Sequence, residues 1–192
     1  MDVVRYSEAR LPTPRGDFRL VVYRTGASGE EHVAMVMGDV AGAEVLTRVH
    51  SSCFTGEVLG SLRCDCREQL DAALARSAVE GRGVLVYLVQ EGRGIGLGNK
   101  VRAYALQDEG VDTVDANLQL GFDADLRSYD LAAAILRDLG ATSIRLMTNN
   151  PDKIAGLERA GLPVVAESHW VGVSEHAVDY VEVKKAKMGH LG

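Results

Sequence analysis

The order of residue patterns along the chain restricts its fold more than any other feature. Runs rich in β-branched and aromatic residues come first, at 18–24, 32–37 and 44–50, with glycine-containing turns between them. Helical and strand patterns then alternate: helices are expected at 68–79, 100–108, 129–139 and 151–160, and strands at 83–89, 143–147 and 164–166. This order predicts an α+β (α/β-like) domain with a mixed β-sheet, antiparallel at its beginning, and flanking helices.

Length and charge limit the organisation and the partners. The 192 residues hold no repeat or long linker, so we expect one domain over 1–192, with a C-terminal tail from about 170 whose order the sequence leaves open. A net charge of −6 disfavours binding to nucleic acid or to an anionic membrane. No apolar run reaches the roughly 18–20 residues that span a bilayer, and residues 1–15 lack a signal-peptide core. A cytoplasmic location is expected.

Three expected strands end in polar segments, at 48–51, 90–93 and 148–150. Binding sites in α/β proteins lie at the carboxyl ends of strands, so these segments are expected to converge on one pocket. Asn150 and Pro151 have the residue types of an N-cap and a first helical position, so a helix should begin there.

The three cysteines, Cys53, Cys64 and Cys66, form a C-x10-C-x-C pattern. Thiolates bind zinc well, and three protein ligands leave a fourth tetrahedral position for water or substrate. His50 could instead close a structural site of three cysteines and one histidine. Buried free cysteines and a redox pair are weaker alternatives, because Arg63 and Asp65 make a poor core context and a C-x-C disulfide is strained.

The net charge of a zinc site with three thiolates limits how strongly the zinc can acidify a bound water. Zinc with three thiolates carries one net negative charge, so it should acidify bound water less than a histidine-ligated zinc does. We expect nearby cations, with Arg48 and Arg93 as candidates, or a base to assist. An unchanged rate after replacement of both arginines would refute this expectation.

Three other segments indicate a function less specifically than the cysteines do. Residues 91–98 are glycine-dense, which lets a backbone approach an anion, but neither a G-x-G-x-x-G register nor a P-loop motif occurs. Asp125 and Ser128 precede a helix, where simple capping is as good an interpretation as catalysis. Thr148 and Lys153 suit phosphate oxygens and would equally suit a surface.

Together these segments resemble the GTP cyclohydrolase II family. The resemblance lies in residues 11–18, 48–70, 89–110, 112–122, 123–127, 145–153 and 185–191. It implies the fold of that family and a homodimer. Some relatives carry an additional dihydroxybutanone phosphate synthase domain, for which we expect no room in these 192 residues.

The resemblance implies roles by matched position. Cys53, Cys64 and Cys66 would hold one Zn²⁺ per chain. Asp125 matches a proton acceptor, Arg127 an arginine that attacks the α-phosphate, and Tyr104 an aromatic active-site position. The GTP contacts would be Arg48, Val49, His50, Ser51, Ser52, Gln69, Glu91, Gly92, Arg93, Thr113, Thr148 and Lys153.

The implied reaction is the first step of riboflavin biosynthesis. Water activated by zinc would attack C8 of GTP, open the imidazole ring and release formate, while pyrophosphate leaves and Mg²⁺ neutralises the triphosphate. The product would be 2,5-diamino-6-ribosylamino-4(3H)-pyrimidinone 5′-phosphate. Glu91 suits guanine N1–H and N2–H as an acceptor. A purely electrostatic role for Arg127 is an alternative, because guanidinium stays protonated.

Three positions depart from the family pattern. Ser52 stands where an acid is usual, Arg67 where glycine is usual, and Ser128 where an acid is common. The changes at Ser52 and Arg67 make the metal rim more positive, which we expect to offset the anionic centre in part. The departures leave open a specialised paralogue that stops at a formamidopyrimidine intermediate. A non-catalytic protein that binds zinc and nucleotide is the alternative from another class.

Overall fold

The computed structural model describes residues 3–26, 29–123, 125–169 and 171. Trp170 and the expected C-terminal tail, apart from Val171, lie outside the described residues. The elements are β1 (Val3–Thr13), β2 (Gly16–Thr25), β3 (Glu30–Met37), β4 (Val45–Ser51), α1 (Phe54–Glu57), α2 (Cys66–Glu80), β5 (Gly83–Leu88), η1 (Glu91–Gly94), α3 (Gly96–Asp108), α4 (Thr113–Gln119), α5 (Asp130–Asp138), β6 (Ile144–Met147), α6 (Pro151–Arg159) and β7 (Val164–Glu167). None of the helices in these residues has the length and apolarity to cross a membrane.

The described strands form one seven-stranded mixed sheet in the order β1-β2-β3-β5-β4-β6-β7. β1, β2, β3 and β5 pair antiparallel, whereas β5, β4, β6 and β7 pair parallel. The expected α+β class and the antiparallel beginning are therefore confirmed. The extension of that beginning to 44–50 is wrong, because β4 lies between β5 and β6. Six of its seven residues are buried, which suits a central strand covered on both faces.

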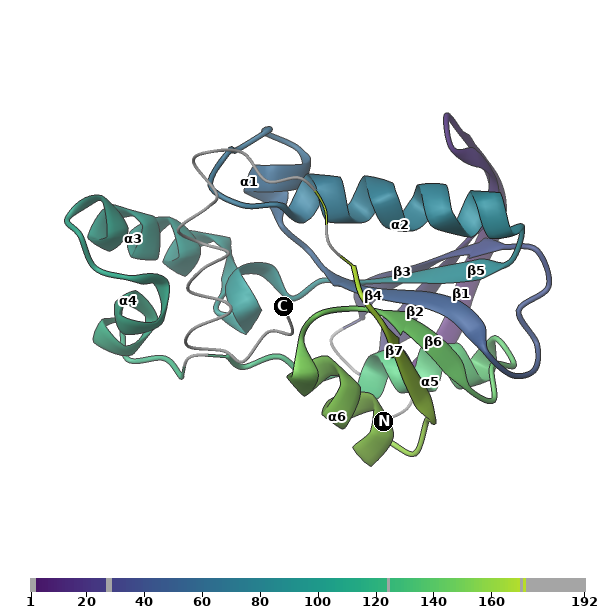
Figure 1. Ribbon diagram of the computed structural model, residues 1–192. Coiled ribbons are helices and arrows are strands. Elements are labelled where there is room, and N and C mark those ends of the chain that lie inside the picture. The colour runs from purple at the N-terminus through teal and green to yellow at the C-terminus, as the bar shows by residue number, and fades with distance from the viewer. Residues whose placement is uncertain (1–2, 27–28, 124, 170, 172–192) are drawn as a thin grey trace.

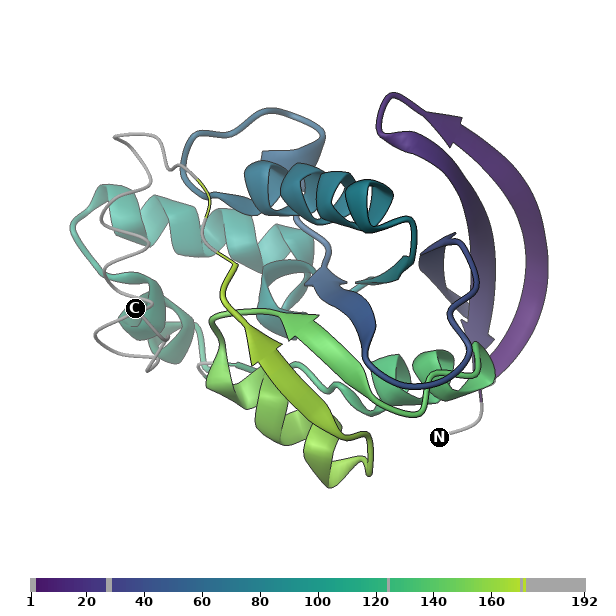
Figure 2. The same cartoon turned by 45° about the vertical axis from the view of Figure 1, so that its right-hand side comes forward.

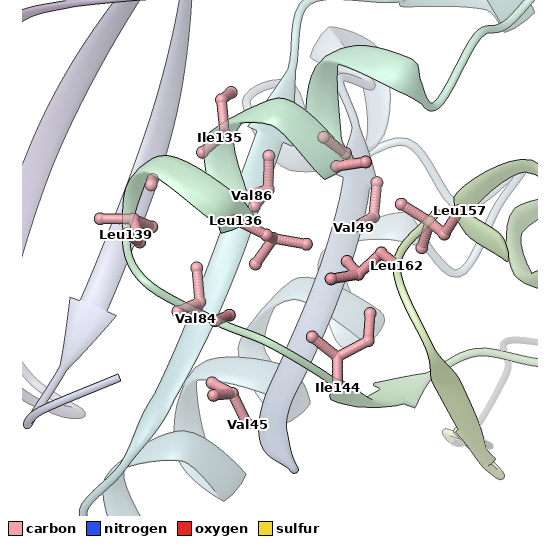
Figure 3. Packing of buried hydrophobic residues seen from close by; sticks show 14 of the residues in the cluster. Val45, Val49, Val84, Val86, Ile135, Leu136, Leu139, Ile144, Leu157 and Leu162 are labelled. Carbon is pink, nitrogen blue, oxygen red and sulfur yellow. The ribbon is translucent and has the colours of Figure 1, made fainter. Parts of the chain in front are cut away.

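Helices cover the two faces of the sheet, with α2 on one face and α5 and α6 on the other (Figure 1). The larger apolar core joins Val45 and Val49 of β4 to α5 and α6, and Figure 3 shows it from close by. The smaller core places Leu46 of β4 against α2. Because side chains alternate along a strand, Arg48 and His50 share the α2 face with Leu46. This alternation brings both residues to the side of the sheet on which the cysteines lie.

Strand β1 is an element that the sequence patterns did not predict. Figure 2 shows it paired with β2 in a long, curved hairpin at the edge of the sheet. Most of its residues are exposed, so it lacks the apolar alternation that marks a half-buried strand. Arg5 and Tyr23 anchor the hairpin, since both donate hydrogen bonds to Asp138 of α5, at 2.7 Å each.

The expected start of α6 is confirmed. The Asn150 side chain accepts a hydrogen bond of 2.9 Å from the backbone N–H of Asp152, and Pro151 occupies the first turn. This cap holds the backbone between the end of β6 and the start of α6.

We expect Asn150→Ala to lower the free energy of unfolding by about 1 kcal/mol, because a helix N-terminal donor loses its partner. Urea denaturation followed by circular dichroism measures the change. Asn150→Asp, which keeps the acceptor, should cost less. Equal stability of the alanine variant and the parent would contradict this role of Asn150.

Candidate active site

The carboxyl ends of the three central parallel strands meet at one edge of the sheet. β5 and β6 both pair in parallel with β4, so the segments that follow them lie side by side. Ser52 ties two of these segments together: its N–H donates to the Leu88 carbonyl at 2.8 Å, and its hydroxyl accepts from the Gln90 N–H at 3.1 Å. The three segments therefore lie together as expected, and a shared pocket between them stays a prediction.

The three cysteines form a compact cluster at this edge. Their sulfur atoms all lie within 4.8 Å of one another, and Cys53 Sγ is 3.6 Å from Cys64 Sγ. Zinc–sulfur bonds of about 2.3 Å at tetrahedral angles place sulfurs about 3.8 Å apart, so the spacing fits a zinc ion. Gly56 of α1 keeps the space open, since a Cβ there would lie 2.8 Å from Cys64 Sγ. No disulfide joins any of the three cysteines.

His50 is not a fourth ligand in this structure. Its Nε2 lies 2.8 Å from Glu57 Oε1, and the Tyr87 hydroxyl donates to the other Glu57 oxygen at 2.7 Å. The imidazole stacks on the Tyr87 ring with centroids 5.8 Å apart. Among the described residues, the only cluster able to hold a metal is the three cysteines. Burial lowers the pKa of His50 to about 4, so the ring is neutral near pH 7.

We expect Glu57→Leu to lower the free energy of unfolding by about 3 kcal/mol, because it leaves the buried polar groups of His50 and Tyr87 without their acceptor. Glu57→Gln is the matched control and should cost less, since its amide can bond to both neighbours. Urea denaturation of the two variants and the parent makes the comparison. An equal loss in both variants would show that the negative charge of Glu57, rather than its hydrogen-bonding capacity, matters.

Arg48 lies under the start of α2 at the junction of β4 and β6. Its guanidinium donates to the Met147 carbonyl at 2.8 Å and to the Gln69 side chain, which in turn donates to Asp65 at 2.6 Å. Burial lowers the pKa of Arg48 to about 10, against the opposing effect of the nearby Cys66 and Asp65. Arg48 therefore stays charged at neutral pH, close to one of the cysteines.

Lys100 of α3 is a site residue that the sequence analysis missed. Its ammonium lies 3.1 Å from Cys53 Sγ and 2.7 Å from Glu91 Oε1. Glu91 also accepts from the backbone N–H of Phe54 at 2.6 Å. Burial alone would lower the pKa of Lys100, but Glu91 and Cys53 raise it above its usual value. A sequence signal existed, because Lys100 precedes Tyr104 by one helical turn and so shares its face.

Tyr104 lies beside the cysteine cluster. Its hydroxyl is 3.3 Å from Thr55 Oγ1, which is 3.8 Å from Cys53 Sγ. The guanidinium carbon of Arg63 lies 4.9 Å from the centre of the Tyr104 ring. Burial raises the pKa of Tyr104, so its hydroxyl is protonated at neutral pH.

Asp125 and Arg127 face each other in a two-point ion pair. Arg127 Nε donates to Asp125 Oδ1 at 2.9 Å, and a second guanidinium nitrogen contacts Oδ2. Burial favours a raised pKa for Asp125, but the Arg127 guanidinium holds it below its usual value. Asp125 thus accepts from Arg127 rather than capping α5.

The glycine-rich segment is held against this ion pair. The backbone N–H of Leu126 donates to the Arg93 carbonyl at 3.1 Å, and the charge of Arg93 helps to lower the pKa of Asp125. Arg93 has a φ of +61°, a left-handed conformation that costs energy for a residue with a side chain. Such strain often occurs at functional sites. Of the two arginines expected to assist a metal centre, Arg93 lies near Asp125, whereas Arg48 lies near Cys66.

The expected phosphate-binding residues are buried at the strand ends. Lys153 Nζ donates to the Val49 carbonyl at 2.8 Å, and Thr148 Oγ1 accepts from the Asn150 N–H at 3.1 Å. Gly92 has a φ of +61°, which suits glycine. Thr113 begins α4, but its side chain lies outside what the structure describes.

Several buried polar atoms at this edge have no hydrogen-bond partner among the described residues. They are Arg48 Nε, His50 Nδ1, Arg93 Nη1 and the Tyr129 hydroxyl. Buried polar groups are nearly always satisfied, so these four atoms are candidates for contacts with a ligand. Burial raises the pKa of Tyr129, and the charges of Arg127, Asp125 and Arg48 also act on it, so the Tyr129 hydroxyl lies near these three residues.

The α+β domain thus brings three cysteine sulfurs, which could hold a metal ion, close to the buried cationic side chains of Arg48 and Lys100. A family model described as GTP cyclohydrolase II matches residues 4–169. The chain therefore belongs to the GTP cyclohydrolase II family, and the enzyme class expected from the sequence is confirmed.

Individual relatives agree with this assignment. The chain is 54% identical to GTP cyclohydrolase-2 of Enterobacter sp. (strain 638) over 100% of its own length and 98% of that protein. It is also 54% identical to the riboflavin biosynthesis protein RibBA of Chlorobium phaeovibrioides, over 98% of the chain and 47% of the relative. A two-domain 3,4-dihydroxy-2-butanone 4-phosphate synthase, RibBX from A. baumannii, matches 86% of the chain and 40% of its own, with a TM-score of 0.47 and 22% identity, too distant to add support.

Proposed function

We propose that this protein hydrolyses GTP in the first step of riboflavin biosynthesis. The reaction opens the imidazole ring, releases formate and pyrophosphate, and yields 2,5-diamino-6-ribosylamino-4(3H)-pyrimidinone 5′-phosphate. The observation that carries the proposal is the cluster of three cysteine sulfurs, which all lie within 4.8 Å of one another. Membership of the family supports GTP as the substrate.

Cys53, Cys64 and Cys66 are the proposed zinc ligands. Zinc held by three thiolates would supply Lewis-acid activation of water. Tyr104 and Thr55 border the cluster, and the protonated Tyr104 hydroxyl is suited to donate a hydrogen bond to a reacting oxygen.

The strand ends are the proposed nucleotide-binding surface. Glu91 is the proposed acceptor for guanine N1–H and N2–H, although its oxygens here accept from Lys100 and Phe54, so substrate must share or displace these bonds. Arg48, Lys153 and Thr148 would position the ribose and phosphates. Direct or backbone contacts are also proposed for Val49, His50, Ser51, Ser52, Gln69, Gly92, Arg93 and Thr113.

Asp125 and Arg127 are the proposed catalytic pair for pyrophosphate release. Asp125 is ionised and can accept a proton, while the paired guanidinium of Arg127 stays protonated. This pairing favours the electrostatic role of Arg127 at the α-phosphate over attack by its nitrogen, since a protonated guanidinium is a poor nucleophile. Mg²⁺ on the triphosphate, a homodimer and a cytoplasmic location remain predictions.

Product analysis tests the proposal. The purified protein is incubated with GTP and Mg²⁺, with zinc present or chelated, and the products are identified by mass spectrometry. We expect zinc-dependent release of formate and pyrophosphate in equal amounts. A retained formyl group would instead establish a ring-opening paralogue, and intact GTP in the presence of zinc-loaded protein would exclude the proposed activity.

A further inference from the structure

One cation at the cysteine cluster has no role in the function proposed above. Lys100 is 9% exposed, and its ammonium bridges two anions, Cys53 Sγ at 3.1 Å and Glu91 Oε1 at 2.7 Å. A buried ammonium is costly unless it is paired, and here both neighbours pair with it. The contact to sulfur reaches the donor atom of a proposed zinc ligand directly.

We propose that Lys100 is a positioning residue for the metal centre: its N–H···S bond to Cys53 supplies the positive charge that a three-thiolate zinc site lacks. The inference rests on the proposed function, because it assumes that Cys53 ligates zinc. A hydrogen bond to a ligating sulfur withdraws electron density from it and fixes its orientation, as groups around a metal ligand commonly do. The zinc then remains a stronger Lewis acid than three unassisted thiolates would allow.

Glu91 holds the lysine in place. Its Oε1 accepts from Lys100, while its Oε2 accepts from the backbone N–H of Phe54, the residue after Cys53. Lys100, Glu91 and the chain beside Cys53 thus form a closed loop of contacts. Without the ammonium, the carboxylate and the anionic centre would be two buried negative groups close together, which is unfavourable.

The arrangement also connects the metal to the glycine-rich segment. Glu91 begins η1, and a Cβ at Gly92 would lie 3.1 Å from the Lys100 Cβ, so the backbone there packs directly on the lysine. A change in how Glu91 is hydrogen-bonded therefore alters the partner of the Cys53 sulfur. This is a physical route by which occupation of the nucleotide site reaches the metal.

Cobalt substitution tests the inference without relying on turnover. The Co²⁺-loaded parent and the variants Lys100→Met and Lys100→Arg are compared by their sulfur-to-cobalt charge-transfer absorption. We expect the band of Lys100→Met at longer wavelength, because a sulfur without its N–H donor gives up electrons more easily, and the band of Lys100→Arg near that of the parent. Arg102→Met, which removes a charge from the exposed side of the same helix, is the control and should leave the band unchanged.

Zinc affinity, measured by competition with a chelator, gives a second readout. Lys100→Met should bind zinc about 10–100-fold more weakly, the usual effect of removing a group that supports a metal ligand. Lys100→Met combined with Glu91→Gln should recover part of that loss, because the second change removes the unpaired carboxylate.

The outcomes separate the inference from the proposed function. Cobalt that binds with the same charge-transfer band and the same affinity in Lys100→Met and the parent would overturn the inference and leave the zinc site intact. The absence of any thiolate charge transfer in the parent would instead refute the cysteine site itself, and the inference with it. A recovery in the double variant would support the charge argument over a merely structural role for Lys100.

Discussion

Cys64→Ser is expected to abolish stable zinc binding and to lower the rate of GTP turnover by a factor of about 1,000 or more. Cys64 Sγ lies 3.6 Å from Cys53 Sγ, so the variant leaves two thiolates where three converge. A metal that acts as a Lewis acid lowers the activation barrier by several kcal/mol. A loss of about 4 kcal/mol corresponds to a factor of roughly 1,000 in rate. Metal content by elemental analysis and turnover of GTP are measured on the same samples.

Ser61→Ala is the matched control for this variant. Ser61 lies in the same loop, where its hydroxyl accepts from the Arg63 N–H at 3.3 Å, but it has no contact with the sulfurs in the described interactions. The control should keep both zinc and activity. Full activity of a zinc-free Cys64→Ser protein would contradict the assignment of the metal to catalysis.

Arg127→Met is expected to lower turnover by about a thousandfold with little change in zinc content. Arg127 binds Asp125 through two guanidinium nitrogens and is the proposed charge partner of the α-phosphate. An arginine that stabilises charge in phosphoryl transfer contributes about 10³–10⁵-fold to the rate. Because charge develops in the transition state, the loss should fall on kcat rather than on KM.

Two further variants sharpen this test. Arg127→Lys keeps the charge and should recover part of the rate if the role is electrostatic, whereas a nucleophilic guanidine would leave a nucleotidyl adduct on the parent protein that mass spectrometry detects. Arg102→Met is the matched control on the exposed side of α3 and should keep full activity. An Arg127→Met variant as fast as the parent would remove Arg127 from the mechanism.

The sequence predicted the fold where apolar patterns are strong. α2 and α5 fall at the expected positions because their apolar residues recur at helical spacing, and β5 does so because it is a short, continuous apolar run. β1 was missed because an exposed edge strand has no such face. The place of β4 could not be predicted from chain order either, since its partners β5 and β6 come later in the sequence and the pairing depends on long-range contacts.

The candidate site, too, could be predicted from the sequence only in part. The cysteine pattern and the strand ends predicted which segments meet, because spacing and residue type carry that information. The partners of individual side chains could not be predicted: His50 offers Nε2 to Glu57 rather than to the sulfurs, and Lys100, on a helix beyond the glycines, reaches Cys53 across 47 positions of the chain. Such contacts depend on how α1 and α3 pack, which no local pattern specifies.

The three residues that depart from the family pattern, Ser52, Arg67 and Ser128, each make hydrogen bonds within the protein. Ser52 connects β4 to Gln90, and Ser128 Oγ lies 2.9 Å from Asp130 Oδ2 at the start of α5. Arg67 donates to the Glu57 carbonyl, next to the buried carboxylate that holds His50. The hypothesis that Ser52 and Arg67 offset the anionic centre stays a prediction. Unchanged zinc affinity and rate in Ser52→Glu would remove it.

X-ray absorption at the zinc edge, on protein that turns over GTP, tests the central claim most directly: that the three cysteines form an open, catalytic zinc centre. We predict three sulfur neighbours at about 2.3 Å and one oxygen at about 2.0 Å, without the scattering pattern of an imidazole. Four sulfurs, or three sulfurs and a histidine, would mean a closed structural site and would contradict the account.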